Sequence, residues 1–257
     1  MYRALRSEFS GRIATVTLAR PERRNALSAE LMREMIACAQ ELAARKDLDV
    51  VLVTGAAGVF SAGADLKDSS RWAGGAALLE QREIAGLGQR MARAWEELPQ
   101  ITIAAIEGYA VGGGLALAVA LDWRVMARDA FVSLPEISLG IPLTWGTLPR
   151  LVNLVGPARA KRLAILGERV GAAEALNMGV VDEVCEPGSA LRAAAILAGK
   201  VLDKPKHSVL MTKETVNAYA GLGAHAVSYM AADQLELAAA SPESRAARES
   251  ALKRKKK

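Results

Sequence analysis

The sequence predicts an α/β fold whose C-terminal part is helical, and three observations lead to this expectation. Residues 12–54 alternate a β-rich run, a helical pattern and an apolar run, which is typical of parallel strands joined by a right-handed crossover. Two later apolar runs, 101–106 and 131–134, have the length of short buried strands. Beyond residue 190 the pattern becomes mostly helical.

The first predicted elements lie between residues 12 and 54. A strand over 12–18 leads into a loop, and Ser28 is a suitable N-cap for the helix that follows, with Glu30 in its first turn. Residues 49–54 contain an unbroken apolar run, as expected for a strand buried on both faces. The helix between the strands carries apolar side chains on one face at helical spacing, namely Leu31, Met35, Cys38 and Leu42.

The middle of the chain mixes a polar loop with apolar elements. Residues 68–79 contain Ser and Gly and are either a lid over a site or a surface insertion, before a helix expected over 79–98. After the strand at 101–106, the run 115–121 has no polar face, and we therefore predict a buried helix there.

The last part of the chain is predicted to contain two short strands and then helices. The strands are expected over 124–127 and 131–134, and Gly179 is a suitable C-cap for the third helix that follows. We divide the chain into a core over residues 1–195 and a helical region over residues 196–257. The expected helices are 146–155, 157–166, 172–178, 190–202 and 209–240.

The charge of the chain is concentrated at its C-terminus. The formal net charge is +5, but residues 253–257 are all basic, so residues 1–252 have a net charge of zero. A nucleic-acid-binding protein spreads positive charge over a face, so we expect no nucleic-acid partner. The basic tail is either a solvated terminus or a contact for an anion such as a ligand phosphate.

Cysteine usage and hydropathy indicate a cytoplasmic protein. Cys38 and Cys185 are too few for a disulfide framework, and we expect two buried free thiols in a reducing compartment. The N-terminus lacks the apolar stretch of a secretory signal. Residues 101–121 are mostly apolar, but Glu107 and the glycines 112–114 argue against a membrane span. No cluster of His, Cys and Asp has metal-binding spacing, so no metal is expected.

Two glycine-bearing turns are the most informative feature of the sequence. The turns at 61–67 and 108–114 each follow an apolar run, and each places small residues where the backbone comes close to another group. Two such turns can direct two backbone N–H groups at one oxygen, which is the geometry of an oxyanion hole. A substrate with a carbonyl group is therefore expected.

Several ordered motifs resemble the crotonase family, the enoyl-CoA hydratase/isomerase superfamily, over almost the whole chain. They are residues 20–27 (RPERRNAL), 60–66 (FSAGADL), 112–114 (GGG) with Asp122, and 134–142 (LPEISLGIP). The resemblance implies a crotonase-like spiral of ββα turns and a helical C-terminal trimerisation region, in a homotrimer or dimer of trimers. It implies an acyl-CoA thioester as the substrate, and no separate cofactor.

The resemblance also implies the roles of individual residues. The N–H groups of Ala64 and Gly113 would bind the thioester oxygen, and Glu136 would be the general base. The coenzyme A pocket would be lined by residues on both turns and in the early loop, namely Arg24, Leu27, Ala62, Ala64, Asp65, Leu66, Lys67, Gly112 and Gly113.

One position departs from the pattern of the hydratases. These enzymes have a first glutamate two residues after the triple glycine, where this chain has Ala116. Two carboxylates share the addition of water, so ordinary hydration should be slow. A lone base is sufficient for a double-bond shift, as in members resembling enoyl-CoA isomerases, or for an atypical hydratase/lyase. In the latter a C-terminal tyrosine orients the substrate, and Tyr229 lies in about that region; an acid near Thr144, typical of dienoyl isomerases, is missing.

Two alternatives remain open at this point. Glu136 could instead cap Ser138 or neighbouring amides, and the chain could be a catalytically degenerate acyl-CoA-binding protein of the same fold. The acyl chain, aliphatic or aromatic, is not specified by the sequence. Trp145 is expected in the core or in the wall of an acyl or aryl pocket.

Overall fold

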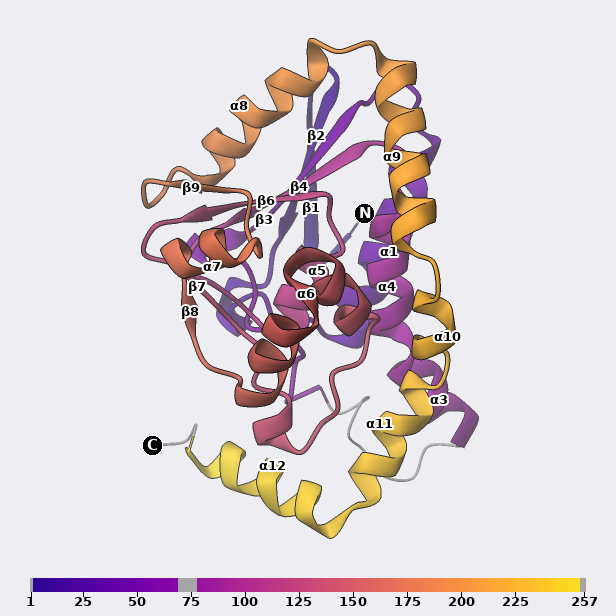
Figure 1. The fold of residues 1–257 in the computed structure, drawn as a ribbon, viewed down its shortest axis with the longest axis vertical. Coiled ribbons are helices and arrows are strands. Elements are labelled where there is room, and N and C mark those ends of the chain that lie inside the picture. The colour runs from indigo at the N-terminus through magenta and orange to yellow at the C-terminus, as the bar shows by residue number, and fades with distance from the viewer. Residues whose placement is uncertain (1, 69–77, 255–257) are drawn as a thin grey trace.

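The large sheet of the molecule has six strands in the order β1-β2-β3-β4-β6-β9 (Figure 1). The structure is a computed structural model that describes residues 2–68 and 78–254. β1 and β2 pair antiparallel, and every later neighbour pairs parallel, so the predicted parallel pairing of β2 and β3 is confirmed. The strands are β1 (Leu5–Ser10), β2 (Ile13–Leu18), β3 (Val50–Gly55), β4 (Ile101–Ile106), β6 (Trp123–Ala127) and β9 (Glu183–Cys185).

A smaller sheet runs beside the large one and gives the fold its spiral. It contains β5 (Tyr109–Val111), β7 (Phe131–Ser133) and β8 (Val170–Gly171). Isolated bridges between Leu27 and Ala64 and between Ser61 and Ala110 extend it. Each of β3, β4 and β6 is thus followed by a segment of the smaller sheet, which repeats the expected ββ unit along the chain.

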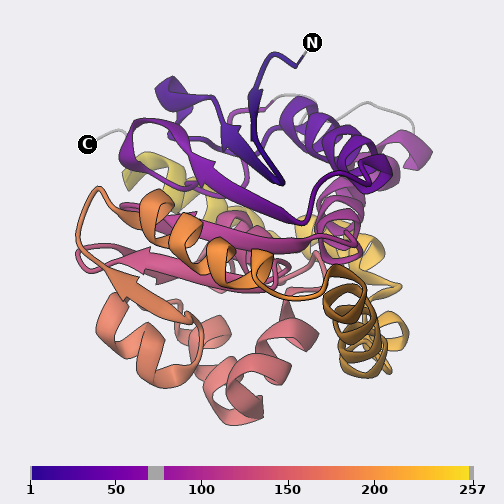
Figure 2. The same cartoon turned by 90° about the horizontal axis from the view of Figure 1, so that it is seen from above.

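Helices cover both faces of the large sheet (Figure 2). On one face, α8 (Ala190–Leu202) packs Ala194 and Ala198 against Val50, Ile103 and other apolar side chains of the sheet. The other face is covered by α1 (Ala29–Ala44), α4 (Leu87–Glu96) and α5 (Gly113–Ala118). Burial on both faces explains why β3 and β4 consist mostly of apolar residues.

The first helix forms as its sequence predicts. The Ser28 hydroxyl accepts a hydrogen bond from the Leu31 N–H at 3.2 Å, and Glu30 lies in the first turn. The four side chains predicted for the inner face, Leu31, Met35, Cys38 and Leu42, are all buried. Capping and the apolar face together fix this helix.

The first half of the chain differs from the prediction at three places. β1 was not predicted, and the helix expected over 79–98 is two helices, α3 (Leu78–Ala85) and α4, which separate at Gly86. The helix expected over 115–121 is buried, as predicted, but it runs from Gly113 to Ala118, because the chain then tightens into turns that return it to β6. Most of the loop expected at 68–79 lies outside the described residues.

The second half differs mainly in the lengths of its elements. α6 (Thr147–Leu166) joins two predicted helices across a kink at Gly156, and Gly179 ends α7 (Ala172–Met178) in the left-handed conformation, as predicted. β8 and β9 were not predicted, because two or three residues give no periodicity. Three helices take the place of the one expected over 209–240, namely α9 (Lys206–Ala220), α10 (Ala224–Ser228) and α11 (Ala231–Ala240). They are followed by α12 (Pro242–Arg254).

The C-terminal helices run along one side of the molecule and then across its end (Figure 1). α9 lies beside the core, whereas α11 reaches the second glycine turn, since Leu235 lines the same cavity as Gly112 and Gly113. The expected division after residue 195 falls within α8 and stays a prediction.

Two smaller points concern membranes and thiols. None of the helices in 2–68 and 78–254 combines the length and hydropathy needed to cross a bilayer. Cys38 is a buried free thiol, as predicted, but Cys185 is only half-buried because β9 lies at the edge of the sheet.

Candidate active site

A small cavity lies where the two glycine turns meet the loop that carries Glu136. Its volume is ≈ 90 Å³. The first turn contributes Ala62 to Ala64 and Leu66, and the second contributes Val111 to Gly113 with Ala116 of α5. The rest of the wall is mostly apolar and includes Leu139, Ile141, Leu143, Trp145 and Leu235.

The backbone of the first turn leaves one N–H group directed away from its own strand. The Leu27 N–H donates to Gly63 O at 2.8 Å, and the Asp65 N–H donates to Leu27 O at 3.1 Å. In such a parallel bridge the residue between them, Ala64, directs its own N–H to the opposite side. No acceptor for this N–H exists among the described residues.

The second turn brings another unused N–H group beside the first. Gly113 is the first residue of α5, where an amide has no partner within the helix. A Cβ built on Gly113 would lie 3.3 Å from Ala64 N, and one built on Gly63 would lie 3.1 Å from Gly113 N. The two predicted oxyanion donors are therefore neighbours on the cavity wall, and within the described chain the Gly113 N–H also has no acceptor.

Polar side chains outside the cavity hold the first turn in place. The Ser61 hydroxyl donates to Asn25 O at 2.8 Å and accepts from the Gly63 N–H at 3.1 Å. Asp65 accepts from Arg20 at 3.0 Å through one carboxylate oxygen and from the Lys67 N–H at 3.0 Å through the other. These contacts fix the backbone that presents the Ala64 N–H.

The glycines of the second turn are required by close approach. Gly112 has φ 55°, and a Cβ there would lie 2.6 Å from Glu136 Oε1. A Cβ on Gly114 would lie 2.8 Å from both the Cβ and the carbonyl oxygen of Ser61. Any larger residue would push apart the two turns or displace the carboxylate.

Glu136 carries the one ionisable side chain in the lining of this cavity, as far as the described residues extend. Its Oε2 atom is buried and has no hydrogen-bond partner within the described chain. Burial raises the pKa of Glu136 to about 7. A carboxyl group with that pKa can take up or release a proton near neutral pH.

The alternative role of Glu136 as a cap is wrong. Glu136 does stand at the start of a short 3₁₀ helix (Ile137–Leu139), where a cap would be expected. Its side chain nevertheless makes no capping hydrogen bond there. The carboxyl group turns instead to Gly112 and the cavity.

Only part of the predicted coenzyme A pocket lines the cavity. Ala62, Ala64, Leu66, Gly112 and Gly113 lie on its wall, and Ala116, 2% exposed, lies there where a hydratase glutamate would be. The predicted residues outside this lining are Arg24 and Lys67, both exposed, and Leu27 and Asp65, both buried.

The Arg24 and Leu27 backbones still adjoin the first turn. Arg24 O accepts from the Ala62 N–H at 3.0 Å, and Leu27 forms the bridge to Ala64. Tyr229 is 62% exposed and absent from the cavity lining, whereas Leu235 of α11 is part of it. No local signal in the sequence marks Leu235, because its place depends on how α11 folds back.

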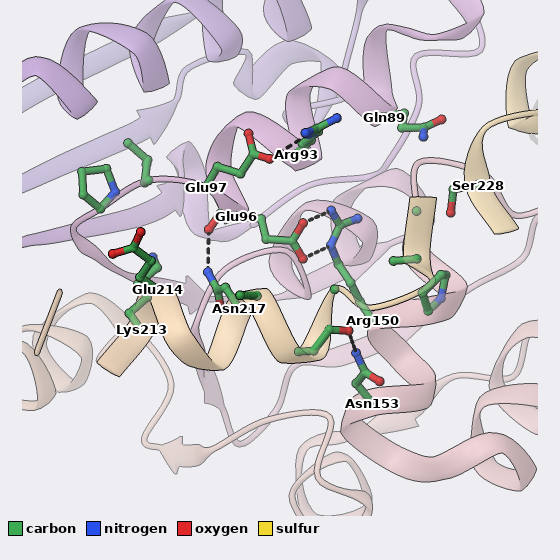
Figure 3. Close-up of a pocket in the computed structure, with 18 of the residues that line it drawn as sticks. Gln89, Arg93, Glu96, Glu97, Arg150, Asn153, Lys213, Glu214, Asn217 and Ser228 are labelled. Atoms are coloured by element: carbon green, nitrogen blue, oxygen red, sulfur yellow. Dashed lines mark hydrogen bonds and ion pairs between the residues drawn. The ribbon is translucent and has the colours of Figure 1, made fainter. Parts of the chain in front are cut away.

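A larger hollow of ≈ 670 Å³ lies between α4, α6 and α9, and several of its polar groups bond to one another (Figure 3). Arg150 forms two hydrogen bonds with the Glu96 carboxylate, at 2.8 and 2.6 Å. Asn217 donates to Glu96 O at 3.1 Å. Across residues 2–68 and 78–254, no three His, Cys, Asp or Glu side chains are grouped for a metal ion.

Comparisons with known proteins agree with the fold and the motifs. The profile of the enoyl-CoA hydratase/isomerase family matches residues 8–256. A probable enoyl-CoA hydratase, echA17 of Mycobacterium avium, is 37% identical over 206 residues, covering 80% of this chain and 78% of its own. A short-chain-enoyl-CoA hydratase of Clostridium acetobutylicum is 33% identical over 211 residues, covering 82% and 79%.

The fold is also that of solved family members. The crystal structure of an enoyl-CoA hydratase from Mycobacterium avium subsp. paratuberculosis superposes with a TM-score of 0.88 and 25% identity, over 99% of this chain and 97% of that one. The crotonase-like α/β fold expected from the motifs is therefore confirmed. The chain belongs to the enoyl-CoA hydratase/isomerase family.

Proposed function

We propose that this protein is an enoyl-CoA isomerase that works with one glutamate. The Glu136 carboxylate removes a proton from C2 of a 3-enoyl-CoA thioester. The electron pair left behind delocalises into a dienolate over the carbonyl group and the C3–C4 double bond. Glu136 then returns the proton to C4, and the product is the 2-enoyl-CoA isomer with no net change in atoms or electrons.

The negative charge of the dienolate falls mainly on the thioester oxygen. The unused N–H groups of Ala64 and Gly113 adjoin each other on the wall of the same cavity as Glu136. Fixed donors in a water-poor site stabilise such a charge strongly, and removal of one typically costs about 3–4 kcal/mol of transition-state stabilisation.

The observation that carries the proposal is the single ionisable side chain in the cavity lining of the described residues. Hydration needs one group to activate water and another to handle the proton at C2, and Ala116 can do neither. A pKa of Glu136 of about 7 suits a group that both accepts and donates a proton. One carboxyl group is enough for a proton shuttle between C2 and C4.

Hydration is the second candidate, because the relatives of this chain are named as enoyl-CoA hydratases. An atypical hydratase or lyase would have to position water without a first glutamate. We expect this reaction to be slower than isomerisation by roughly the 10²–10⁴-fold that one general acid or base contributes. A protein that only binds acyl-CoA would show neither reaction.

The test compares both reactions in the wild type and in Glu136→Gln. Short 3-enoyl-CoA and 2-enoyl-CoA substrates are followed by absorbance and chromatography, and butyryl-CoA binding is measured by calorimetry. We expect Glu136→Gln to lose at least about 100-fold in isomerisation while binding changes little, because the amide fills the same space without acting as a base. Exchange of the C2 protons of butyryl-CoA in D₂O should be lost in parallel.

Glu174→Gln is the matched control, since Glu174 is exposed on α7 and lies outside the cavity lining. It should retain full activity. Unchanged isomerisation in Glu136→Gln would refute the role of Glu136 as the general base. Hydration faster than isomerisation in the wild type would favour the second candidate. Binding of butyryl-CoA without isomerisation, hydration or proton exchange would mean that the protein only binds acyl-CoA.

The proposal extends to self-association through the C-terminal helices. α9 and the segment after it expose large apolar side chains, among them Val216, Tyr219, Leu222 and Val227, each at least 58% exposed. Such a surface is typical of an interface between copies. Sedimentation velocity should detect a homotrimer or a dimer of trimers, and Tyr219→Glu with Leu222→Glu should reduce its mass. A monomeric wild type would contradict this.

A further inference from the structure

Trp145 has an unusual conformation in the wall of the small cavity. It is 5% exposed, and its φ of 62° is in the left-handed region that large side chains rarely adopt. Such a conformation is unfavourable and persists only where the surroundings hold it. The contacts of the indole must therefore hold the backbone of Trp145 in this conformation.

Two glycines make room for the indole on its two sides. A Cβ on Gly113 would lie 2.6 Å from Trp145 Cη2, and a Cβ on Gly88 of α4 would overlap the indole outright. The ring is thus held between the oxyanion turn and α4, with no space for even a methyl group at either contact. This fit fixes the position of the ring relative to the Gly113 N–H.

The backbone of Trp145 is anchored from behind. Its carbonyl oxygen accepts a hydrogen bond from Arg150 Nη1 at 2.8 Å. The same guanidinium forms the two hydrogen bonds with Glu96 described above, and Figure 3 shows this pair in the larger hollow. The indole is therefore supported by an ion pair between α6 and α4.

Trp145 also separates the two cavities. The indole lines the small cavity, whereas the next residue, Gly146, and the anchoring Arg150 line the larger hollow. On α4, Gly88 contacts the ring and Gln89 lines the larger hollow. Trp145 thus lies between a cavity of ≈ 90 Å³, which it lines, and one of ≈ 670 Å³, which its neighbours line.

We propose that Trp145 closes the acyl end of the site and restricts the enzyme to short aliphatic acyl groups. A cavity that holds benzene has a volume of about 150 Å³, and the ≈ 90 Å³ here is smaller. A four-carbon acyl group fits beside Glu136, whereas an eight-carbon chain or an aryl group meets the indole. This inference rests on the proposed function, because it takes the cavity as the site for a thioester acyl group.

The test measures binding as a function of chain length, independently of turnover. Calorimetry gives Kd values for butyryl-CoA, octanoyl-CoA and phenylacetyl-CoA with the wild type, Trp145→Ala and Trp145→Gly. Glycine suits the left-handed φ at this position, so the second variant remains informative if the first folds poorly. Trp123→Ala is the matched control, since Trp123 is half-buried on β6 and outside the small cavity.

We expect the wild type to bind the four-carbon thioester at least roughly 10-fold more tightly than the longer and aryl thioesters, in line with the discrimination that a lack of room for a methylene provides. The Trp145 variants should lose or reverse this preference, and Trp123→Ala should keep it. Equal binding of all three thioesters by the wild type, or an unchanged preference in a folded Trp145 variant, would overturn the inference.

The outcomes also separate this inference from the proposed function. A chain-length preference that depends on Trp145, without turnover of any enoyl-CoA, would support the inference and refute the isomerase. Isomerisation of four- and eight-carbon substrates at equal kcat/KM by the wild type would support the isomerase and overturn the inference. Absence of binding and turnover for every thioester would overturn both.

Discussion

The carboxylate of Glu136 lies directly against the backbone of Gly112, with Oε1 2.6 Å from the position that a Cβ would take. Gly112 directly precedes Gly113, the proposed oxyanion residue, so the proposed base is in contact with the turn that carries the proposed donor. The absence of a side chain at residue 112 therefore allows the Glu136 carboxyl group and the unused Gly113 N–H to share one small cavity.

Replacing this glycine should impair catalysis more than folding. Gly112→Ala should lower kcat by at least about 10-fold, because the methyl group displaces the Glu136 carboxylate and the φ of 55° is unfavourable for alanine. Steady-state kinetics with a short 3-enoyl-CoA measures this. In the control Gly199→Ala, nothing lies within 4 Å of the new Cβ on α8, so activity should be unchanged. Equal activity of the two variants would show that the contact has no role.

The pH dependence of the reaction should report the ionisation of Glu136. A general base must be deprotonated, so kcat/KM should rise with pH, pass its midpoint near 7 and level off above it, because burial raises the pKa of Glu136 to about 7. A midpoint near 4.5, the ordinary value of a glutamate, would contradict this environment.

The unfolding free energy should also depend on Glu136, but it should fall with rising pH where the activity rises. The folded protein holds the Glu136 proton up to about pH 7, whereas the unfolded chain releases it near 4.5. The stabilisation that the folded state gains from holding this proton is complete below pH 4.5 and is lost as pH rises through 7. The unfolding free energy should therefore fall over this range. Glu136→Gln, measured by urea denaturation at each pH, should lack this part of the decline.

The main features of the site were predictable because they depend on local requirements. Close approach and positive φ need glycine, so the triple glycine marked the second turn, and Gly63 with φ 86° marked the first. The apolar β3 and β4 showed a sheet covered on both faces. Ala116 stands where a hydratase would have its first glutamate, and the structure places this alanine on the cavity wall.

Other features depend on contacts between distant parts of the chain. The left-handed φ of Trp145 follows from the fit of its ring between Gly88 and Gly113, which no local pattern encodes. Leu235 enters the cavity wall only because α11 folds back across the site. Strands as short as β8 contain too few residues for periodicity and form because β7 offers an edge for pairing.

Restoring the missing acid should change the balance of reactions. Ala116→Glu should raise the hydration of crotonyl-CoA by roughly 10-fold or more, because a second carboxyl group would face Glu136 across the cavity and could activate water. Ala116→Gln is the matched control, since it adds the same bulk without a base. Both rates are followed by the loss of absorbance of the conjugated thioester. An equal effect of the two variants would mean that the added volume alone governs the change.

The attachment of α9 to the core offers a separate prediction about stability. Lys213 is the one buried residue of α9, and its Nζ donates to Asp122 Oδ2 at 2.6 Å and to Gln100 O at 2.7 Å. Burial lowers the pKa of Lys213, which means that the charged form depends on these partners. The helix that leads to α11 is thus held by a buried polar contact.

Lys213→Met should therefore lower the unfolding free energy by about 3–5 kcal/mol, as expected when one partner of a buried ion pair is removed. The matched control is Lys200→Met, whose pair with Glu183 is 64% and 41% exposed and should contribute no more than about 1 kcal/mol. Urea denaturation of both variants at one protein concentration compares them directly, because self-association would otherwise shift the midpoint. Equal losses of unfolding free energy in the two variants would mean that α9 is held mainly by other contacts. The Asp122 carboxylate would then be sufficiently satisfied by Thr102, which donates to it through its N–H and hydroxyl groups.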